Sequence, residues 1–118
     1  GAAIEVHSTL GSGYLERVYH EALRLELAQL KIPFHSEVEV PVWYKGIKLG
    51  AGDRADLICH GDILVELKAQ DSVGRIEAAQ VINYLLAGRL PIGLLLNFGE
   101  PLLHIKRFAG PEHFRQPV

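Results

Sequence analysis

Two short apolar runs joined by a glycine-containing loop constrain the fold of this chain most strongly. They occupy residues 55–59 and 63–69, on either side of a loop at 60–62. Short β-branched runs around such a loop are typical of a β-hairpin. If the loop has three residues, Asp56 faces Glu66 across the two strands. A one-residue slip would mix polar and apolar side chains on each face, so the pattern itself favours this register.

The two faces of the predicted hairpin differ in character because side chains alternate along a strand. One face is apolar, with Ala55, Leu57, Cys59, Ile63, Val65, Leu67 and Ala69. The other face holds the charges, with Arg54, Asp56, Ile58, Leu64, Glu66 and Lys68. Like charges that face each other are destabilising, whereas two carboxylates beside a lysine can hold a hard divalent cation. The hairpin alone favours a simpler interpretation, in which Arg54 and Lys68 neutralise the acids on a solvated face.

Composition narrows the class of protein. The 118 residues suit one domain, predicted over 1–118, and the formal net charge of −2 gives no overall basic signature for nucleic acid. A single cysteine excludes an internal disulfide and fits a reducing, cytoplasmic location. No apolar run reaches membrane-spanning length, so we expect no membrane partner. The chain lacks Met and begins at Gly1, which suggests a missing upstream segment.

Periodicity and turn residues predict the remaining elements. Helices are expected at 2–10, 14–31 and 73–88, the last capped by Asp71 or Ser72. Strands are expected near 38–42, 47–49, 92–97 and 102–108, besides the hairpin, and the tail 110–118 is predicted to be loop. Pro41 favours an edge or a strand end for the first strand. Helices flanking a mixed β-sheet make this an α/β fold.

Four short motifs then follow one another along the chain. They are Gly13-x-x-Glu16-x-x-Tyr19, Arg54-Ala55-Asp56, Glu66-Leu67-Lys68 and Gln80-x-x-x-Tyr84. Together, over about residues 1–108, they resemble the GxxExxY protein family, a branch of the PD-(D/E)xK nuclease superfamily. The resemblance implies a restriction-endonuclease-like core of α-β-β-β-α-β order and further helix before the position of Gly1. One departure is Ala55, which stands where the superfamily pattern has a proline that supplies no ligand.

The resemblance also implies a role for each matched residue. The implied ligands of Mg²⁺ (or Mn²⁺) are Glu16, Asp56, Glu66 and the carbonyl of Leu67. The implied catalytic set is Asp56, Glu66, Lys68, Gln80 and Tyr84. Lys68 would orient or deprotonate the attacking water or stabilise phosphate charge, and the pair on the last helix would support the site or touch phosphate. Arg54 and Tyr19 are predicted to contact substrate.

Simpler interpretations stay open for several of these residues. Glu16 could be an exposed helix acid with Tyr19 as a half-buried neighbour. Gln80 and Tyr84 could form an ordinary helix–sheet contact, and Arg54 could pair with Glu77. Cys59 falls on the apolar face and is predicted to belong to the core.

The leading hypothesis is a metal-dependent nuclease that hydrolyses phosphodiester bonds of DNA or RNA. The alternative is a catalytically inactive module that binds nucleic acid or protein, and a third is a domain whose acids hold a structural ion. An intact set of Glu16, Asp56, Glu66 and Lys68 favours the first, because a decayed site usually loses one member. The small surface of a single domain also suggests a homodimer.

Overall fold

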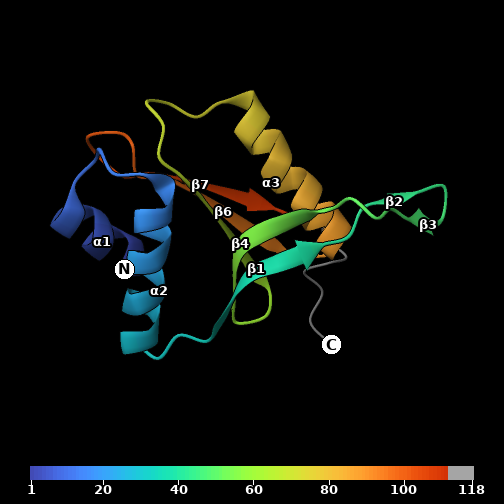
Figure 1. The fold of residues 1–118 in the computed structure, drawn as a ribbon, viewed down its shortest axis with the longest axis horizontal. Coiled ribbons are helices and arrows are strands. Elements are labelled where there is room, and N and C mark those ends of the chain that lie inside the picture. The colour runs from blue at the N-terminus through green and yellow to red at the C-terminus, as the bar shows by residue number, and fades with distance from the viewer. Residues whose placement is uncertain (112–118) are drawn as a thin grey trace.

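A five-stranded mixed sheet with helices packed on its two faces forms the body of the molecule (Figure 1). The computed structural model describes residues 1–111 of the chain. Its elements are α1 (Ala2–Leu10), α2 (Glu16–Gln29), β1 (Phe34–Val40), β2 (Trp43–Tyr44), β3 (Ile47–Lys48), β4 (Asp53–Cys59), β5 (Ile63–Lys68), α3 (Arg75–Gly88), β6 (Ile92–Asn97) and β7 (His104–Ala109). The α/β fold predicted from the sequence is confirmed, and it agrees with a restriction-endonuclease-like core.

The sheet has the strand order β1-β4-β5-β6-β7. β5 and β6 run parallel, and the other neighbouring strands of this sheet run antiparallel. A parallel pair needs a crossover connection, and α3 provides it. Gly93 of β6 lets this helix approach closely, because a Cβ at that position would lie 2.8 Å from Val81 Cγ1.

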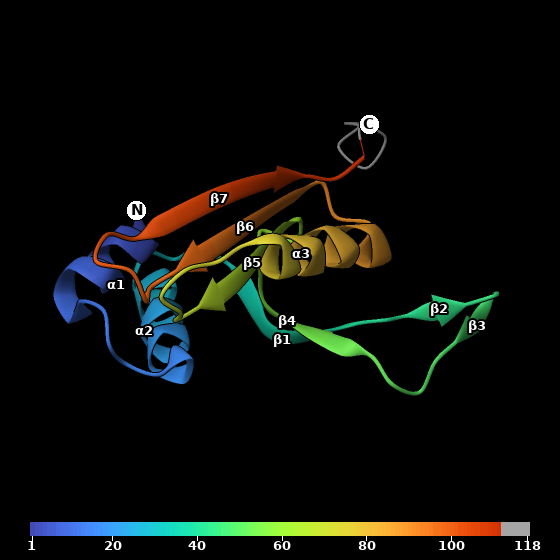
Figure 2. The same cartoon turned by 90° about the horizontal axis from the view of Figure 1, so that it is seen from above.

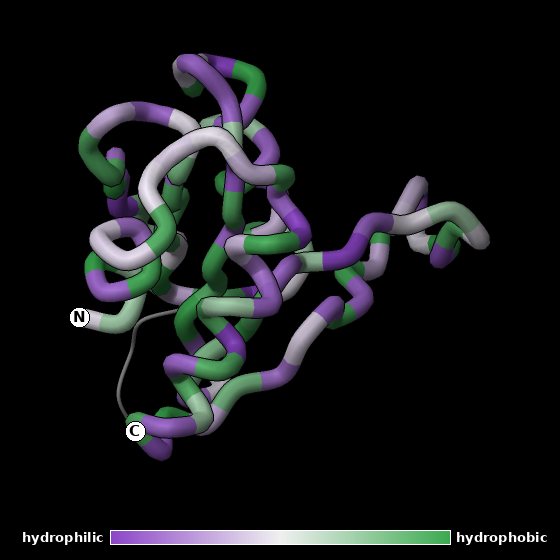
Figure 3. The backbone as a smooth tube through the Cα atoms, turned by 60° about the vertical axis from the view of Figure 1, so that its left-hand side comes forward, coloured by the Kyte–Doolittle hydropathy of each residue, from purple (hydrophilic) through white to green (hydrophobic). Residues whose placement is uncertain are grey.

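Each face of the sheet carries its own hydrophobic cluster. The cluster between the sheet and the helices α1 and α2 consists of Val6, Tyr19, Leu23, Leu27, Leu57, Cys59, Val65, Leu67, Leu96 and Phe98. The cluster between the sheet and α3, called the cluster under α3 below, consists of Val40, Ala55, Leu64, Val81, Tyr84, Leu85, Leu90 and Leu95. Figure 3 shows the most hydrophobic stretches gathered in the middle of the molecule. Cys59 is buried and free, as predicted.

The register of the central hairpin is confirmed. Leu57 pairs with Val65 and Cys59 with Ile63, around a loop at 60–62. The prediction that Ala55 shares a face with Leu57 is wrong, because Ala55 packs in the cluster under α3 and Leu57 in the other cluster. The regular pairing is interrupted at Asp56, whose N–H donates to a side chain, and the β1 residue opposite, Glu37, has φ 50°. The alternation of faces therefore does not continue through this point.

A second hairpin projects from the body of the molecule (Figure 2). This arm, residues 42–49, contains β2 and β3, and Leu49 N–H donates to Val42 O at 2.9 Å. Its two-residue turn has φ 49° at Lys45 and 80° at Gly46. Left-handed values at both positions define a type I′ turn, whose twist matches that of the flanking strands.

Several element boundaries differ from the predictions. α2 is shorter at both ends than the expected helix over 14–31, and β1 begins earlier and ends at Val40, directly before Pro41. α3 begins at Arg75, because Gly74 is its N-cap and donates its N–H to Glu77 Oε1 at 2.6 Å. The predicted caps, two and three residues upstream, are wrong. From residue 112 on, the predicted loop lies outside the described residues. None of the helices described is long and apolar enough to cross a membrane.

Asn97, at the end of β6, ties together two loops that lie far apart in sequence. Its Oδ1 accepts from the N–H groups of Gln70 at 3.0 Å and Gly99 at 3.1 Å. Its Nδ2 donates to Gln70 O at 2.9 Å and to Glu100 Oε2 at 2.7 Å. A Cβ on Gly99 would collide with the backbone of Gln70, so the loops meet backbone to backbone. This contact fixes the chain just beyond β5.

We predict that Asn97→Ala lowers the free energy of unfolding by about 3 kcal/mol, because it leaves several buried polar groups without partners. The control is Asn83→Ala on α3, where the side chain is exposed. Urea unfolding measures both variants. Equal stability of the two would contradict a structural role for the Asn97 contacts.

Candidate active site

Two carboxylates join β4 to β5 where the regular pairing of these strands ends. The N–H of Asp56 donates to Glu66 Oε1 at 2.9 Å. The N–H of Leu67 donates to Asp56 Oδ2 at 2.8 Å. Side-chain oxygens thus act as acceptors where backbone carbonyls act along the rest of the ladder. This exchange holds both acids at one point of the hairpin.

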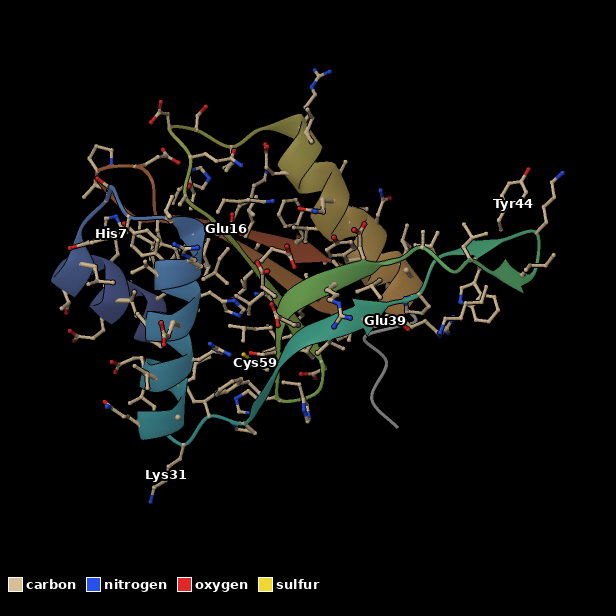
Figure 4. All side chains as sticks on the ribbon, in the orientation of Figure 1. His7, Glu16, Lys31, Glu39, Tyr44 and Cys59 are labelled. Atoms are coloured by element: carbon tan, nitrogen blue, oxygen red, sulfur yellow. The ribbon has the colours of Figure 1, made fainter. Side chains whose placement is uncertain are left out.

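Glu16 reaches the same point from α2. It is the first residue of the helix, and Figure 4 shows it at the N-terminal end of α2, beside the central strands. The loop before it needs a backbone conformation that favours glycine, with φ 71° at Gly11 and 115° at Gly13. Asp56 is the nearest acid acting on the pKa of Glu16.

The three carboxylates affect one another electrostatically. Burial, followed by the charge of Asp56, raises the pKa of Glu66 to about 8. Burial also raises the pKa of Asp56, although the hydrogen bond from Leu67 N–H opposes this shift. The pKa of Glu16 is raised by burial and then by Asp56. Desolvation and like charges both disfavour the ionised form, so ionising all three acids together is unfavourable unless a cation lies among them.

Lys68 is the predicted base or charge stabiliser, and it lies close to all three acids. It is the last residue of β5 and half-buried, and its charge lowers the pKa of Glu16, Asp56 and Glu66. Its backbone O accepts a hydrogen bond from Phe98 N–H at 2.8 Å. The end of β5 is therefore fixed on both of its neighbours, which positions the lysine.

Gln80 and Tyr84 form a pair on α3. Gln80 Nε2 donates to the Tyr84 hydroxyl at 3.1 Å. Tyr84 is buried in the cluster under this helix. Burial, then the charges of Glu66 and Asp53, raise the pKa of the Tyr84 phenol to about 12. The pair thus borders the acids and also contributes to the helix–sheet contact.

Tyr19 does not meet the expectation of a substrate contact, because its side chain is 0% exposed. Its hydroxyl donates to Gly11 O at 2.7 Å and accepts from Tyr14 N–H at 3.2 Å. Its ring stacks on Phe98 with 4.7 Å between centroids. The tyrosine anchors the loop that leads to Glu16, which gives the spacing of this motif a structural reason.

Arg54 is exposed on β4, in register with Glu39 of β1. No ion pair joins Arg54 to Glu77 among the described residues, and the Glu77 carboxylate accepts from Gly74 N–H. This hydrogen bond lowers the pKa of Glu77. Arg54 thus lies two residues from Asp56 with its side chain open to solvent.

Sequence reasoning missed His20. It lies on α2 one turn after Glu16, and its charge lowers the pKa of both Glu16 and Asp56. Its Nε2 is buried without a hydrogen-bond partner among the described residues. The four-residue spacing from Glu16 places both on one face of the helix, and this signal was present in the sequence.

The donor chemistry of the site fits a hard divalent cation. Carboxylate and carbonyl oxygens are the ligands that Mg²⁺ prefers, and Glu16, Asp56, Glu66 and Leu67 would provide them. Within residues 1–111, however, no three His, Cys, Asp or Glu side chains already form a metal-binding cluster. Asp56 and Glu66 instead accept from backbone N–H groups. Each of these hydrogen bonds uses a single carboxylate oxygen, Glu66 Oε1 or Asp56 Oδ2, and the other oxygen of each acid could serve as a metal ligand.

Comparison with known proteins agrees with this fold. The model of the PD-(D/E)XK nuclease superfamily matches residues 1–108, so the chain belongs to this superfamily. The fold is similar to that in the crystal structure of SSO0001, with a TM-score of 0.65 and 21% sequence identity. The similarity covers 81% of this chain and 50% of that one, so this chain spans about half the length of SSO0001. At this identity the likeness concerns the fold alone. No curated protein was found to match the sequence.

The raised pKa of Glu66 predicts that metal-free protein loses stability as the pH rises. Below about pH 4.5 the folded and unfolded states both hold the proton, so nothing is lost. Between about pH 4.5 and 8 only the folded state holds it, so each step in pH favours unfolding, and above pH 8 the loss is constant. We expect a loss on the order of 2–4 kcal/mol in wild type between pH 5 and 8.

Glu66→Gln should remove most of this pH dependence while keeping the acceptor for Asp56 N–H. The control is Glu21→Gln, which alters an exposed acid of α2. Urea unfolding with EDTA at several pH values measures the slopes. If stability depends on pH equally in wild type and Glu66→Gln, the raised pKa of Glu66 is not the cause of that dependence.

The unfavourable joint ionisation of the three acids also predicts stabilisation by metal. Millimolar Mg²⁺ or Mn²⁺ at pH 8 should raise the Tm of wild type by several degrees, at about 4 °C per kcal/mol, because the unfolded chain lacks the site. Asp56→Asn should lose most of this gain. Asp62→Asn, in the exposed loop of the same hairpin, should keep it. An unchanged wild-type Tm in both metals would count against metal binding by the free protein.

Proposed function

We propose that this protein is a metal-dependent nuclease that hydrolyses phosphodiester bonds of DNA or RNA. The observation that carries the proposal is the meeting of Asp56, Glu66 and Lys68 from one hairpin with Glu16 from α2. Phosphodiester hydrolysis needs oxygen ligands for a cation and a positive group near the phosphate. Membership of the nuclease superfamily supports the same chemistry.

Each residue has a distinct task in this proposal. Asp56, Glu66 and the Leu67 carbonyl hold the cation, and Glu16 binds it or one of its waters. When bound, Mg²⁺ or Mn²⁺ supplies water of lowered pKa and neutralises charge that develops on the phosphate. Lys68 orients the attacking water and stabilises the phosphate. The Gln80–Tyr84 pair keeps α3 against the site and offers a hydrogen bond to substrate.

We also propose that the chain belongs to the GxxExxY branch and forms one nuclease-like domain. The support is the local structure of the motif. Gly13 has φ 115°, Glu16 begins α2 beside the acids, and Tyr19 anchors the preceding loop. The three named positions of the motif thus serve one purpose, which is to place a single carboxylate.

A second candidate is a module that binds nucleic acid without cleaving it. The observation in its favour is that no three metal-ligating side chains already form a cluster in the described part of the chain. A panel of labelled single- and double-stranded DNA and RNA, incubated with Mg²⁺ or Mn²⁺, separates the two. Metal-dependent cleavage of any substrate supports the nuclease, and binding without cleavage supports the module.

We predict that Lys68→Ala lowers the cleavage rate by at least about 100-fold, because the lysine acts on charge that develops in the transition state. Its effect on nucleic-acid affinity should be within a few-fold, since one phosphate contact is a small part of an electrostatic interface. Cleavage kinetics and fluorescence anisotropy measure the two quantities.

The matched control for this variant is Lys106→Ala, which removes an exposed lysine on β7. It should leave cleavage unchanged. Circular dichroism establishes that each variant is folded. Activity that persists in a folded Lys68→Ala, Asp56→Ala double variant would come from a contaminating nuclease, and the assignment of the site would be wrong.

A further inference from the structure

The arm displays large aromatic side chains that the body of the protein does not cover. Trp43 is 57% exposed and Tyr44 58%, and Ile47 is 67% exposed. Figures 1 and 2 show the arm extending away from the sheet, and Figure 4 shows Tyr44 on it. Most large aromatic side chains contribute to a core or an interface. We propose that the arm binds nucleic acid by stacking its aromatic rings on unpaired bases, an inference that rests on the proposed nuclease function.

Each aromatic ring of the arm has a lysine beside it. Trp43 and Lys48 are directly opposite in the β2–β3 register, so their side chains share a face. On the other side, Lys45 Nζ lies 5.4 Å from the centroid of the Tyr44 ring. A nucleotide presents a flat base and an adjacent negative phosphate. Ring and cation together match both parts of it, as in proteins that bind single strands.

The charge around the arm is also suited to phosphate. Residues 40–52 contain two lysines and no acid, in a chain whose net charge is −2. Lys48 Nζ pairs with Glu39 Oε1 at 3.1 Å, but both side chains are at least half exposed. An exposed pair of this kind is weak, so a phosphate can replace the glutamate. Arg54, exposed on the strand that leaves the arm, adds a cation between the arm and the acids, although Asp53 precedes it and Glu39 is in register with it.

The distance between the arm and the acids sets a length for the nucleic acid. Asp56 lies eight positions after Lys48, which is at most about 29 Å of extended chain. At the stacked spacing of about 3.4 Å per nucleotide, roughly eight or nine nucleotides span this length, and an unstacked strand needs fewer. A longer strand can therefore touch both places, whereas a much shorter one cannot.

A second copy of the chain fits the arm less well. A stable interface uses about 800 Å² and roughly 20–30 residues on each partner. The arm has only the eight residues 42–49, and two of them are lysines. Its combination of separate rings and cations suits a polyanion with flat bases better than a flat protein surface.

Trp43 is the single tryptophan of the chain, so its fluorescence reports on the arm directly. Titration with a 20-nucleotide single strand in EDTA, where no cleavage occurs, should quench this fluorescence. Measured by fluorescence anisotropy of a labelled strand, Trp43→Ala should weaken binding about tenfold, and Trp43→Phe should restore most of it, because stacking needs only a ring.

The contribution of charge is tested with a matched pair of lysines. Lys45 and Lys31 are both exposed and both have positive φ, 49° and 60°. Lys45→Gln should reduce the salt dependence of binding by a slope of roughly 0.7, as expected for one lost phosphate contact. Lys31→Gln, at the far end of α2, should not change it.

The outcomes separate this proposal from the nuclease function. Quenching in the wild type, together with weaker binding by Trp43→Ala, supports nucleic-acid binding by the arm even if no cleavage is found with any metal. Cleavage with no quenching, or equal affinity of wild type and Trp43→Ala for the 20-nucleotide strand, overturns it. A self-association in sedimentation that Trp43→Ala abolishes, with nucleic-acid affinity unchanged, would identify a second copy as the occupant and overturn it as well.

Discussion

Repulsion among three neighbouring carboxylates, with Glu66 buried, Asp56 half-buried and Glu16 exposed, is the constraint on which the rest of this structure depends. Asp56 and Glu66 are kept together because each acid accepts a backbone N–H from the strand of the other. These two hydrogen bonds replace part of a β-ladder, so the same residues that would bind metal also close the hairpin. Contacts around the end of β5, from Phe98 and from Asn97, hold this arrangement against its own charge.

The features that could be predicted from the sequence are local ones. The register of the central hairpin follows from alternation over a few residues, and the structure has the predicted pairs Leu57–Val65 and Cys59–Ile63. The proximity of Asp56, Glu66 and Lys68 follows from that register alone. Periodicity did not predict that Glu16 lies near these residues. Only the order of the motifs indicated that the end of a distant helix meets this hairpin.

The features that escaped prediction depend on contacts between distant segments. Ala55 belongs to the cluster under α3 because the regular strand pairing is interrupted at Asp56. The alternation of polar and apolar residues in the sequence does not reveal such an interruption. Tyr19 has the appearance of a surface residue beside Glu16, yet the loop at Gly11 and the ring of Phe98 enclose it. Asn97 is a polar residue at a strand end in the sequence, and one of its partners, Gln70, lies 27 residues away.

The two hairpin turns share a choice of residue that has a consequence for the protein as a whole. Lys45-Gly46 and His60-Gly61 both place a non-glycine residue at positive φ before the glycine. Asparagine is the residue that tolerates this conformation best and is favoured there. The chain is therefore not tuned for maximal thermostability at either turn. At position 45 the arm thus carries a cation at the tip of a turn that a neutral asparagine would stabilise better.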